Sequence, residues 1–231
     1  MSLLAARKLS THFPIRGGVF KKAVGSVRAV HEVSLEIQTG EIVGLVGESG
    51  CGKSTLGFSL LGLTPPTSGE ILLMGSSIDI HKSSSWKPFR RDFQIVFQDP
   101  YTSLNPRLTV FELLAEPLAT HGLVKRSELR EAASDLLRRV GLSTDALDRF
   151  PHAFSGGQRQ RLCIARALGL KPKLIVCDEI VSALDVSVQA QIVNLLLDLK
   201  REHGLSLLFI THDLSLVRSI ADRVLVMYLG R

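Results

Sequence analysis

The sequence predicts an α/β protein built around a mostly parallel sheet, and two observations carry this prediction. The second half of the chain alternates short apolar runs with longer helical patterns, which is the order expected when helices connect parallel strands. The apolar runs at 174–177, 205–210 and 224–227 are continuous, as expected for strands that are covered on both faces. With 231 residues, of which 45% are hydrophobic, the chain is long enough to bury a large core.

Strand and helix signals follow one another along most of the chain. Strand-like segments are expected near 3–13, 28–37, 41–46, 70–73, 93–97, 174–178, 206–210 and 224–229. Helical patterns are expected at 54–62, 109–116, 127–140, 157–169, 187–203 and 213–221. Ser127 is a residue type that favours the N-cap of the third of these helices, and Gly141 is a residue type that ends one.

Two stretches differ from this alternation. Residues 99–150 carry helical patterns, show no strand signal and are bracketed by prolines, so we expect them to form an inserted helical subdomain. Residues 14–26 contain glycines and lysines between two early strand signals, and we expect them to form a loop.

The charge pattern argues against a nucleic-acid-binding protein. The formal net charge is +6, but the basic residues come in scattered pairs and aromatic residues make up only 6% of the chain. A nucleic-acid-binding surface more often shows a concentrated basic stripe with interleaved aromatics. We therefore expect no nucleic-acid partner.

The cysteines and the apolar segments indicate a protein of the reducing cytosol. Cys51, Cys163 and Cys177 show no C-x-x-C spacing, which argues against both a disulfide framework and a structural zinc site. No apolar stretch approaches the roughly 20 residues that span a bilayer. The apolar part of the N-terminus is too short for a secretory signal. We expect a protein that is soluble by itself.

A phosphate-binding loop is the clearest chemical signal. Residues 47–55 read GESGCGKST, which matches G-x-x-x-x-G-K-S, between an expected strand and an expected helix. The glycines let backbone N–H groups point at phosphate oxygens, and the helix N-terminus adds its positive end. Lys53 would reach the outer phosphates and the Ser54 hydroxyl would ligate Mg²⁺. The predicted nucleotide-binding residues of this loop are Gly47, Glu48, Ser49, Gly50, Cys51, Gly52, Lys53, Ser54 and Thr55.

Two further segments point to hydrolysis of the bound nucleotide. The strand at 174–178 ends in Asp178, which can hold the Mg²⁺ shell, and Glu179 follows, which can orient or deprotonate a water. The turn Ser155-Gly-Gly-Gln158 opens a helix and is a second anion site by the same physics as the first. Two such sites serve one nucleotide only if two copies of the domain face each other head to tail.

At this point the sequence resembles the ATP-binding cassette (ABC) ATPases, over residues 3–231. The phosphate loop resembles Walker A, Leu174–Glu179 resembles Walker B, and Ser155–Gln158 resembles the family signature. Other residues that match family motifs are the Q-loop glutamine Gln98, the D-loop aspartate Asp185 and the switch histidine His212. The resemblance implies one nucleotide-binding domain over residues 1–231, with a P-loop NTPase core, an antiparallel β subdomain and an inserted helical subdomain.

The resemblance also implies a composite ATP site. ATP would lie between Walker A of one cassette and the signature of the other, which consists of Ser155, Gly156, Gly157 and Gln158. Glu179, His212 and Gln98 would be catalytic, and Asp185 would line the dimer interface. Mg²⁺ would be held by Ser54, Gln98 and Asp178. Phe13 and Phe20 are the candidates for the aromatic that stacks on adenine.

A finer resemblance lies in residues 97–109, in 181–191 and in the early insert at 13–20. These segments are similar to the second ATPase subunit of oligopeptide, dipeptide and nickel importers. That branch implies a second ABC subunit, two membrane permease subunits and, indirectly, a substrate-binding protein, with the ATPase on the cytoplasmic side of a bacterial inner membrane. Tyr101 and Leu104 would either line the groove for a permease helix or belong to the local core. The branch carries a C-terminal extension, which we expect this chain to lack.

Two alternatives belong to other functional classes. One is an ABC subunit of a soluble enzyme complex, such as the phosphonate carbon–phosphorus lyase assembly. The other is a non-transport ABC protein that acts on DNA or ribosomes, and it is disfavoured because the chain shows no long coiled-coil insertion, zinc cysteines or tandem cassettes. The sequence does not name the cargo: short peptides are expected first and nickel second.

Overall fold

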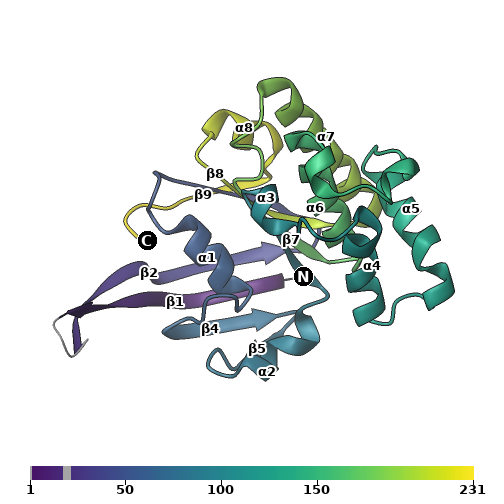
Figure 1. Cartoon of the computed structure of the whole chain (residues 1–231). Coiled ribbons are helices and arrows are strands. Elements are labelled where there is room, and N and C mark those ends of the chain that lie inside the picture. Colours follow the sequence, from purple (N-terminus) through teal and green to yellow (C-terminus); the bar gives the residue numbers. More distant parts are fainter. Residues whose placement is uncertain (1, 18–21) are drawn as a thin grey trace. The chain divides into compact units, whose positions relative to one another are not determined.

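The computed structural model describes residues 2–17 and 22–231 (Figure 1). The chain divides into two compact units. Unit 1 comprises Met1–Arg90 and Ser206–Arg231, and unit 2 comprises Arg91–Leu205. Parallel strands, an antiparallel sheet and helices are all present, which confirms the predicted α/β class. Within the described ranges, no helix combines the length and the apolar composition that a membrane span requires.

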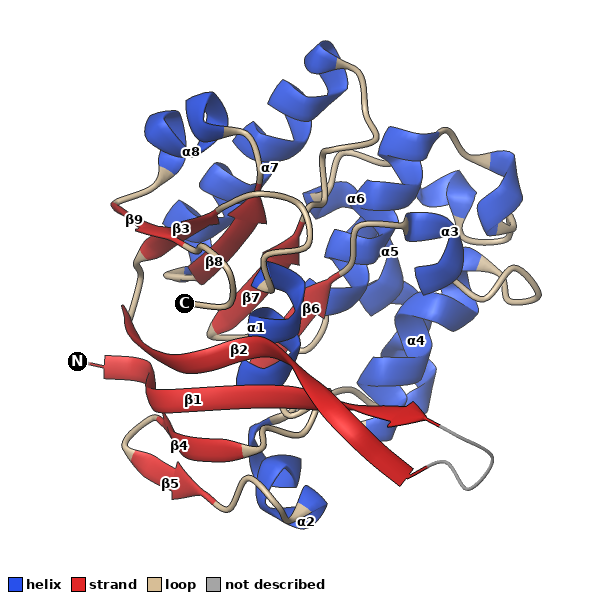
Figure 2. Cartoon of the chain, turned by 90° about the vertical axis from the view of Figure 1, so that its left-hand side faces the viewer, coloured by secondary structure: helices blue, strands red, loops and turns tan. Residues whose placement is uncertain are grey.

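Unit 1 contains an antiparallel sheet that begins at the N-terminus. It consists of β1 (Ser2–Gly17), β2 (Lys22–Gln38), β4 (Ser68–Leu73) and β5 (Ser76–Ile78), in the order β2-β1-β4-β5 (Figure 2). Leu4 pairs with Leu73 and Ala6 with Ile71, and all four side chains are buried. Alternate residues of a strand point to the same face, so these pairs form one apolar face of the sheet.

The structure corrects the loop expected at residues 14–26. β1 continues to Gly17 and β2 starts at Lys22, so that most of this segment belongs to a long hairpin (Figures 1 and 2). Phe13 lies opposite Val27 and Ile15 opposite Gly25. Cross-strand pairing of this kind outweighs a glycine- and lysine-rich composition that by itself is typical of loops. Phe20 lies outside the described residues.

The second part of unit 1 is a set of parallel strands that leads to the phosphate loop. β3 (Ile42–Val46) lies between β8 (Ser206–Thr211) and β9 (Arg223–Val226), and every residue of β3 and β8 is buried. A Cβ added at Gly44 would collide with the Val217 side chain of α8 (Leu214–Ile220), so glycine allows this helix to pack directly on the strand. Three short elements complete the unit: α1 (Lys53–Leu60), α2 (Ser83–Trp86) and the 3-10 turn η1 (Lys87–Phe89).

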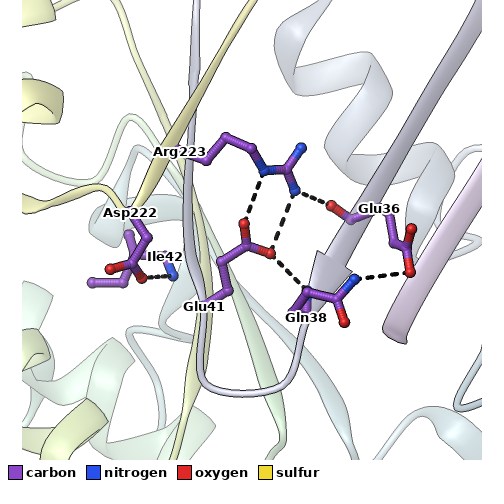
Figure 3. A network of polar contacts seen from close by, with 6 residues as sticks. All are labelled: Glu36, Gln38, Glu41, Ile42, Asp222 and Arg223. Atoms are coloured by element: carbon purple, nitrogen blue, oxygen red, sulfur yellow. Dashed lines mark hydrogen bonds and ion pairs between the residues drawn. The ribbon is translucent and has the colours of Figure 1, made fainter. Parts of the chain in front are cut away.

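A polar network fixes the start of β9 against the turn between β2 and β3 (Figure 3). Arg223 Nε donates to Glu41 Oε1 at 2.9 Å, and its Nη2 donates to the Glu36 carbonyl oxygen. Glu41 Oε2 also accepts from the Gln38 backbone N–H at 2.7 Å. Burial acts to raise the pKa of Glu41, but the hydrogen bonds from Arg223 and Gln38 outweigh it, and the pKa is lowered.

Unit 2 contains a parallel strand pair and a group of helices. β6 (Phe93–Val96) pairs in parallel with β7 (Leu174–Asp178). The helices are α3 (Pro100–Ser103), α4 (Val110–Thr120), α5 (Leu129–Arg139), α6 (Gly156–Leu168) and α7 (Val186–His203), with 3-10 turns η2 (Arg126–Glu128), η3 (Thr144–Ala146) and η4 (Pro151–Ala153). Leu113, Ala133 and Leu137 are among the side chains that bury the apolar faces of α4 and α5.

The third predicted helix begins later than the sequence indicated. Ser127 lies inside the 3-10 turn η2, and the N-cap of α5 is Glu128, so the prediction of Ser127 as N-cap is wrong. The tight turn takes up the residues that would otherwise form the first turn of the α-helix. The predicted end is confirmed: Gly141 follows the C-cap Val140 with φ +70°, a left-handed conformation that glycine adopts without strain.

Candidate functional site

The phosphate loop lies between β3 and α1, as predicted. The loop residues Glu48, Ser49 and Gly50 are exposed, whereas the strand that ends at Val46 is fully buried. Gly50 has φ +78° and Gly52, the N-cap of α1, has φ +108°. Only glycine adopts such angles without cost, and they let the chain turn sharply from strand to helix. Ser54 and Thr55 lie in the first turn of α1 and are half-buried.

Lys53 folds back over the loop. Its side chain is only 4% exposed, and Nζ donates to the carbonyl oxygens of Gly47 and Glu48, each at 2.9 Å. An ammonium group bonded to two carbonyls of the loop links the loop's start to its end. The buried lysine is therefore positioned by the loop that contains it.

His212 lies at the carboxyl end of a strand next to the phosphate loop. Val46 of β3 pairs with Thr211 of β8, so Gly47 and His212 are each the first residue after a paired strand position. The His212 side chain is exposed, and the next residue, Asp213, caps α8 by accepting from the backbone N–H groups of Ser215 and Leu216. The cap fixes the turn that carries the histidine.

Unit 2 brings Gln98 and Glu179 together. Val96 of β6 pairs with Cys177 of β7. Gln98 lies two residues after Val96, and Glu179 lies two residues after Cys177. Gln98 Nε2 donates to Glu179 Oε2 at 3.2 Å and to Ser182 Oγ at 3.3 Å. Asp178, directly before Glu179, is buried at 5% exposure.

Glu179 has a backbone conformation that is unusual for its residue type. Its φ is +48°, in the left-handed region, although it carries a full side chain. Such a conformation costs on the order of 1 kcal/mol and is concentrated at functional sites. Ser182 stabilises the turn, because its backbone N–H and its hydroxyl both donate to the Glu179 carbonyl oxygen, at 3.1 and 2.8 Å. Sequence reasoning placed Ser182 only within a motif and did not predict this role.

The signature residues form the N-terminus of α6. Ser155 is the N-cap: its Oγ accepts from the Gln158 N–H at 3.4 Å, and its own N–H donates to Gln158 Oε1 at 3.0 Å. This reciprocal capping box satisfies two otherwise free helix donors. A Cβ at Gly157 would collide with the Val188 side chain of α7, and one at Gly156 would lie 3.4 Å from Leu184. Gly157 therefore lets two helices approach closely.

Asp185 is the N-cap of α7. Its carboxylate accepts from the Val188 N–H at 2.9 Å and from the Ser187 hydroxyl at 2.7 Å. These hydrogen bonds, with Val188 first, lower the pKa of Asp185. The side chain is exposed, so the residue has a structural role and also presents a fixed negative charge at the surface.

The two residues predicted for a permease groove have different environments. Tyr101 is 65% exposed, whereas Leu104 is 1% exposed and belongs to the core. The local-core alternative therefore applies to Leu104. Tyr101 packs on the guanidinium of Arg159, whose carbon lies 3.9 Å from the ring centroid. Arg159 is buried and donates to the carbonyls of Pro151 and His152. The sequence analysis did not single it out.

Comparisons with known proteins identify the family. The family model described as "ABC transporter" matches residues 30–182. The chain is 54% identical over 230 residues to "Probable peptide ABC transporter ATP-binding protein y4tS" of Sinorhizobium fredii, which covers 100% of this chain and 65% of that protein. It is 51% identical over 231 residues to "Oligopeptide transport ATP-binding protein AppF" of Bacillus subtilis, covering 100% of this chain and 70% of that protein.

A solved structure agrees with these relatives. The dimeric ATP-binding cassette MJ0796 bound to ADP and Pi matches with a TM-score of 0.84 and 30% identity, covering 98% of this chain and 95% of that one. The chain spans about two thirds of the length of the two curated relatives above. By family model, by sequence identity over the whole of this chain and by structure, the chain belongs to the ABC transporter family, and it is similar to ATP-binding proteins of oligopeptide and glutathione importers.

Proposed function

We propose that this chain is the ATP-hydrolysing subunit of an ABC importer of short peptides and that it works as a head-to-tail cassette dimer. The observation that carries the proposal is the placement of Glu179 in a left-handed turn with its carboxylate 3.2 Å from the Gln98 amide. A carboxylate held in a strained turn beside an amide is suited to accept a proton from a water that the amide helps to orient.

The phosphate loop supplies the binding groups. Backbone N–H groups of Gly47–Thr55 and the N-terminus of α1 bind phosphate oxygens, and Lys53 exchanges the carbonyls of Gly47 and Glu48 for the outer phosphates. The Ser54 hydroxyl, the Gln98 side-chain oxygen and the Asp178 carboxylate are hard oxygen donors, the chemistry that Mg²⁺ prefers. Mg²⁺, when bound, neutralises charge on the phosphates.

Glu179, Gln98 and His212 act on the reaction. Glu179 takes the proton of the attacking water, and Gln98 holds that water against it. His212, presented by the capped turn before α8, donates toward the γ-phosphate. The signature residues Ser155–Gln158 of a partner cassette cover the nucleotide from the other side, since the N-terminus of their helix favours an anion. Phe13, which is 43% exposed, and Phe20 are the proposed candidates to stack on adenine.

The relatives support the transport assignment and the partners. Both curated relatives carry peptide or oligopeptide transport in their names, which favours peptides over nickel and a transporter over a soluble enzyme complex. The cassette MJ0796 is dimeric with ADP and Pi, which supports the dimer. The proposed partners are a second ABC subunit, two permease subunits and, indirectly, a substrate-binding protein. The proposed place is the cytoplasmic side of a bacterial inner membrane.

Replacing Glu179 with glutamine tests the proposal. Glu179→Gln removes the proton acceptor and keeps the phosphate-binding groups, so ATP turnover in the assembled transporter should fall about 100- to 10,000-fold. The affinity of the purified chain for ATP should remain unchanged. Because ATP is no longer consumed, a head-to-tail dimer should accumulate with ATP and be visible by size-exclusion chromatography.

Two variants serve as controls. Glu116→Gln makes the same change at an exposed position on α4 and should leave turnover at the parent level. Lys53→Ala should lose ATP binding itself. If Glu179→Gln turns over ATP at the parent rate, Glu179 is not the catalytic base. If Lys53→Ala binds ATP as tightly as the parent, the phosphate loop is not the ATP-binding site.

A further inference from the structure

The last turn of the described chain lies against the back of the phosphate loop. Met227 N–H donates to the Val46 carbonyl oxygen at 2.7 Å, where β3 ends. Gly230 N–H donates to the Cys51 carbonyl oxygen at 3.0 Å, and the Gly230 carbonyl accepts from the His31 N–H of β2 at 2.7 Å. The turn itself is closed by Tyr228 and Arg231, which exchange backbone hydrogen bonds at 2.8 and 3.0 Å. Gly230 thus connects β2 to the loop: its carbonyl is bonded to His31 of β2, and its N–H is bonded to Cys51 of the loop.

We propose that the segment Met227–Gly230, the brace, holds the phosphate loop in its nucleotide-binding conformation, and that Gly230 is a positioning residue for ATP binding. The inference rests on the proposed function in one respect, namely that Gly47–Thr55 holds the phosphates. In this proposal Gly230 acts only through the loop's backbone, to which its N–H donates at Cys51.

The glycines of the loop support the brace. A Cβ at Gly47 would collide with the Met227 carbonyl oxygen. A Cβ at Gly52 would collide with the Ala29 carbonyl oxygen of β2 and would lie 2.9 Å from the Met227 methyl carbon. Gly50, by contrast, has nothing within 4 Å of its Cβ position. Gly47 is therefore needed because the brace leaves no room for a Cβ, and Gly52 because β2 and the brace leave none and because its φ is +108°. Gly50 is needed for its backbone angles alone.

Gly230, on the brace itself, also lies where there is no room for a Cβ. It has φ +82°, and a Cβ there would lie 2.8 Å from the Arg28 carbonyl oxygen and 3.1 Å from that of Ala29. A side chain at this position would push the turn away from β2 and withdraw the Gly230 N–H from Cys51. The peptide after Cys51 leads directly into Gly52 and Lys53, so its orientation decides whether the loop's N–H groups converge on an anion.

The experiment compares two alanine substitutions with the same backbone strain. Gly230→Ala breaks the brace, and Gly75→Ala is its matched control: Gly75 has φ +79° in the turn between β4 and β5, with nothing within 4 Å of its Cβ position. The first readout is the rate at which N-ethylmaleimide alkylates Cys51 without nucleotide, followed by peptide mass spectrometry. The second is the affinity for a fluorescent ATP analogue.

Cys51 is a selective reporter of the loop. It is 8% exposed and lies inside the loop, whereas Cys163 and Cys177 are 3% and 0% exposed. Burial raises the pKa of Cys163 to about 11 and that of Cys177 further still, so both thiols react slowly in the folded chain. In Gly230→Ala, Cys51 should be alkylated about fivefold faster or more, and the analogue should bind about tenfold more weakly, as for one lost hydrogen bond. Gly75→Ala should match the parent in both.

A second pair of variants leaves the backbone untouched. Met227 is 2% exposed, so Met227→Ala removes packing behind Gly52 and should weaken analogue binding and speed Cys51 alkylation, whereas Met227→Leu should keep both near the parent. Equal behaviour of the two glycine variants, or unchanged alkylation in both Gly230→Ala and Met227→Ala, would overturn the brace. If the proposed function is wrong, the ATP analogue should still bind to Lys53→Ala. The rate of Cys51 alkylation is measured without nucleotide, so it tests the brace whether or not the proposed function is correct.

Discussion

The glycine at the centre of the signature segment is expected to be required by packing between α6 and α7. Gly157 is the second residue of α6, and a Cβ at this position would collide with Val188 Cγ1 in the first turn of α7. Gly157→Ala therefore forces the two helices apart or forces Val188 into another rotamer. Alanine is otherwise the better helix former, so the two effects oppose each other.

The magnitudes decide the sign. Replacing glycine by alanine within a helix stabilises by about 1 kcal/mol, and the gain is smaller so close to the N-terminus. Overpacking a close helix contact costs about 1–3 kcal/mol. We expect Gly157→Ala to lower the free energy of unfolding by about 1 kcal/mol, with a favourable coupling of about 1–2 kcal/mol to Val188→Ala, which removes the colliding atoms.

The assay is a double-mutant cycle on the purified chain. Urea unfolding is followed for the parent, both single variants and the double variant, and ATP-analogue binding confirms that each is folded. The double variant should be more stable than the sum of the single changes predicts. If Gly157→Ala is as stable as the parent or more stable, or if the two changes simply add, the close contact does not explain the glycine.

Two further predictions concern the core and the pH dependence of stability. Leu104→Ala should lower the free energy of unfolding by about 2–5 kcal/mol, because the side chain is 1% exposed. Tyr101→Ser should lower it by about 1 kcal/mol or less, the size of the contact between Tyr101 and Arg159. Equal losses of stability in urea unfolding would contradict the assignment of Leu104 to the core and of Tyr101 to the surface. Arg223→Met should lower stability by about 1 kcal/mol at pH 7, because Arg223 is partly exposed and screened. The pKa of Glu41 is lowered in the folded chain, so its contribution to stability is complete above the ordinary glutamate value of 4.5 and is lost as the pH falls through the lower pKa of the folded chain. The difference in stability between parent and Arg223→Met should therefore narrow in unfolding curves at acidic pH and not at pH 7 to 8.

Much of the candidate site was predictable because its signals are local. The phosphate loop needs glycines at fixed offsets and a lysine after them, and a buried strand before it reads as a continuous apolar run. The same holds for Asp178 at the end of β7 and Glu179 directly after it. The N-cap serine of the signature helix follows from the four donors that every helix start leaves unsatisfied.

Other predictions failed where a neighbouring segment outweighs local composition. Residues 14–26 look like a loop, yet 14–17 and 22–26 are held in a hairpin by pairs such as Ile15 with Gly25. Ser127 is a good N-cap by type, but a 3-10 turn occupies its position. In both cases the deciding interactions involve the path of the chain through a sheet or a turn, which propensities do not encode.

The sequence by itself determined the α/β class, the order of the motifs and the residues proposed to carry the chemistry, because periodicity and fixed spacing are properties of the chain alone. Only the tertiary structure decided why particular glycines are there. Gly47, Gly52 and Gly157 each lie where a carbonyl or a side chain from a distant segment leaves no room for a Cβ. It also decided that Glu179 meets Gln98 across two paired strands, since strand register, and not sequence distance, sets which residues become neighbours.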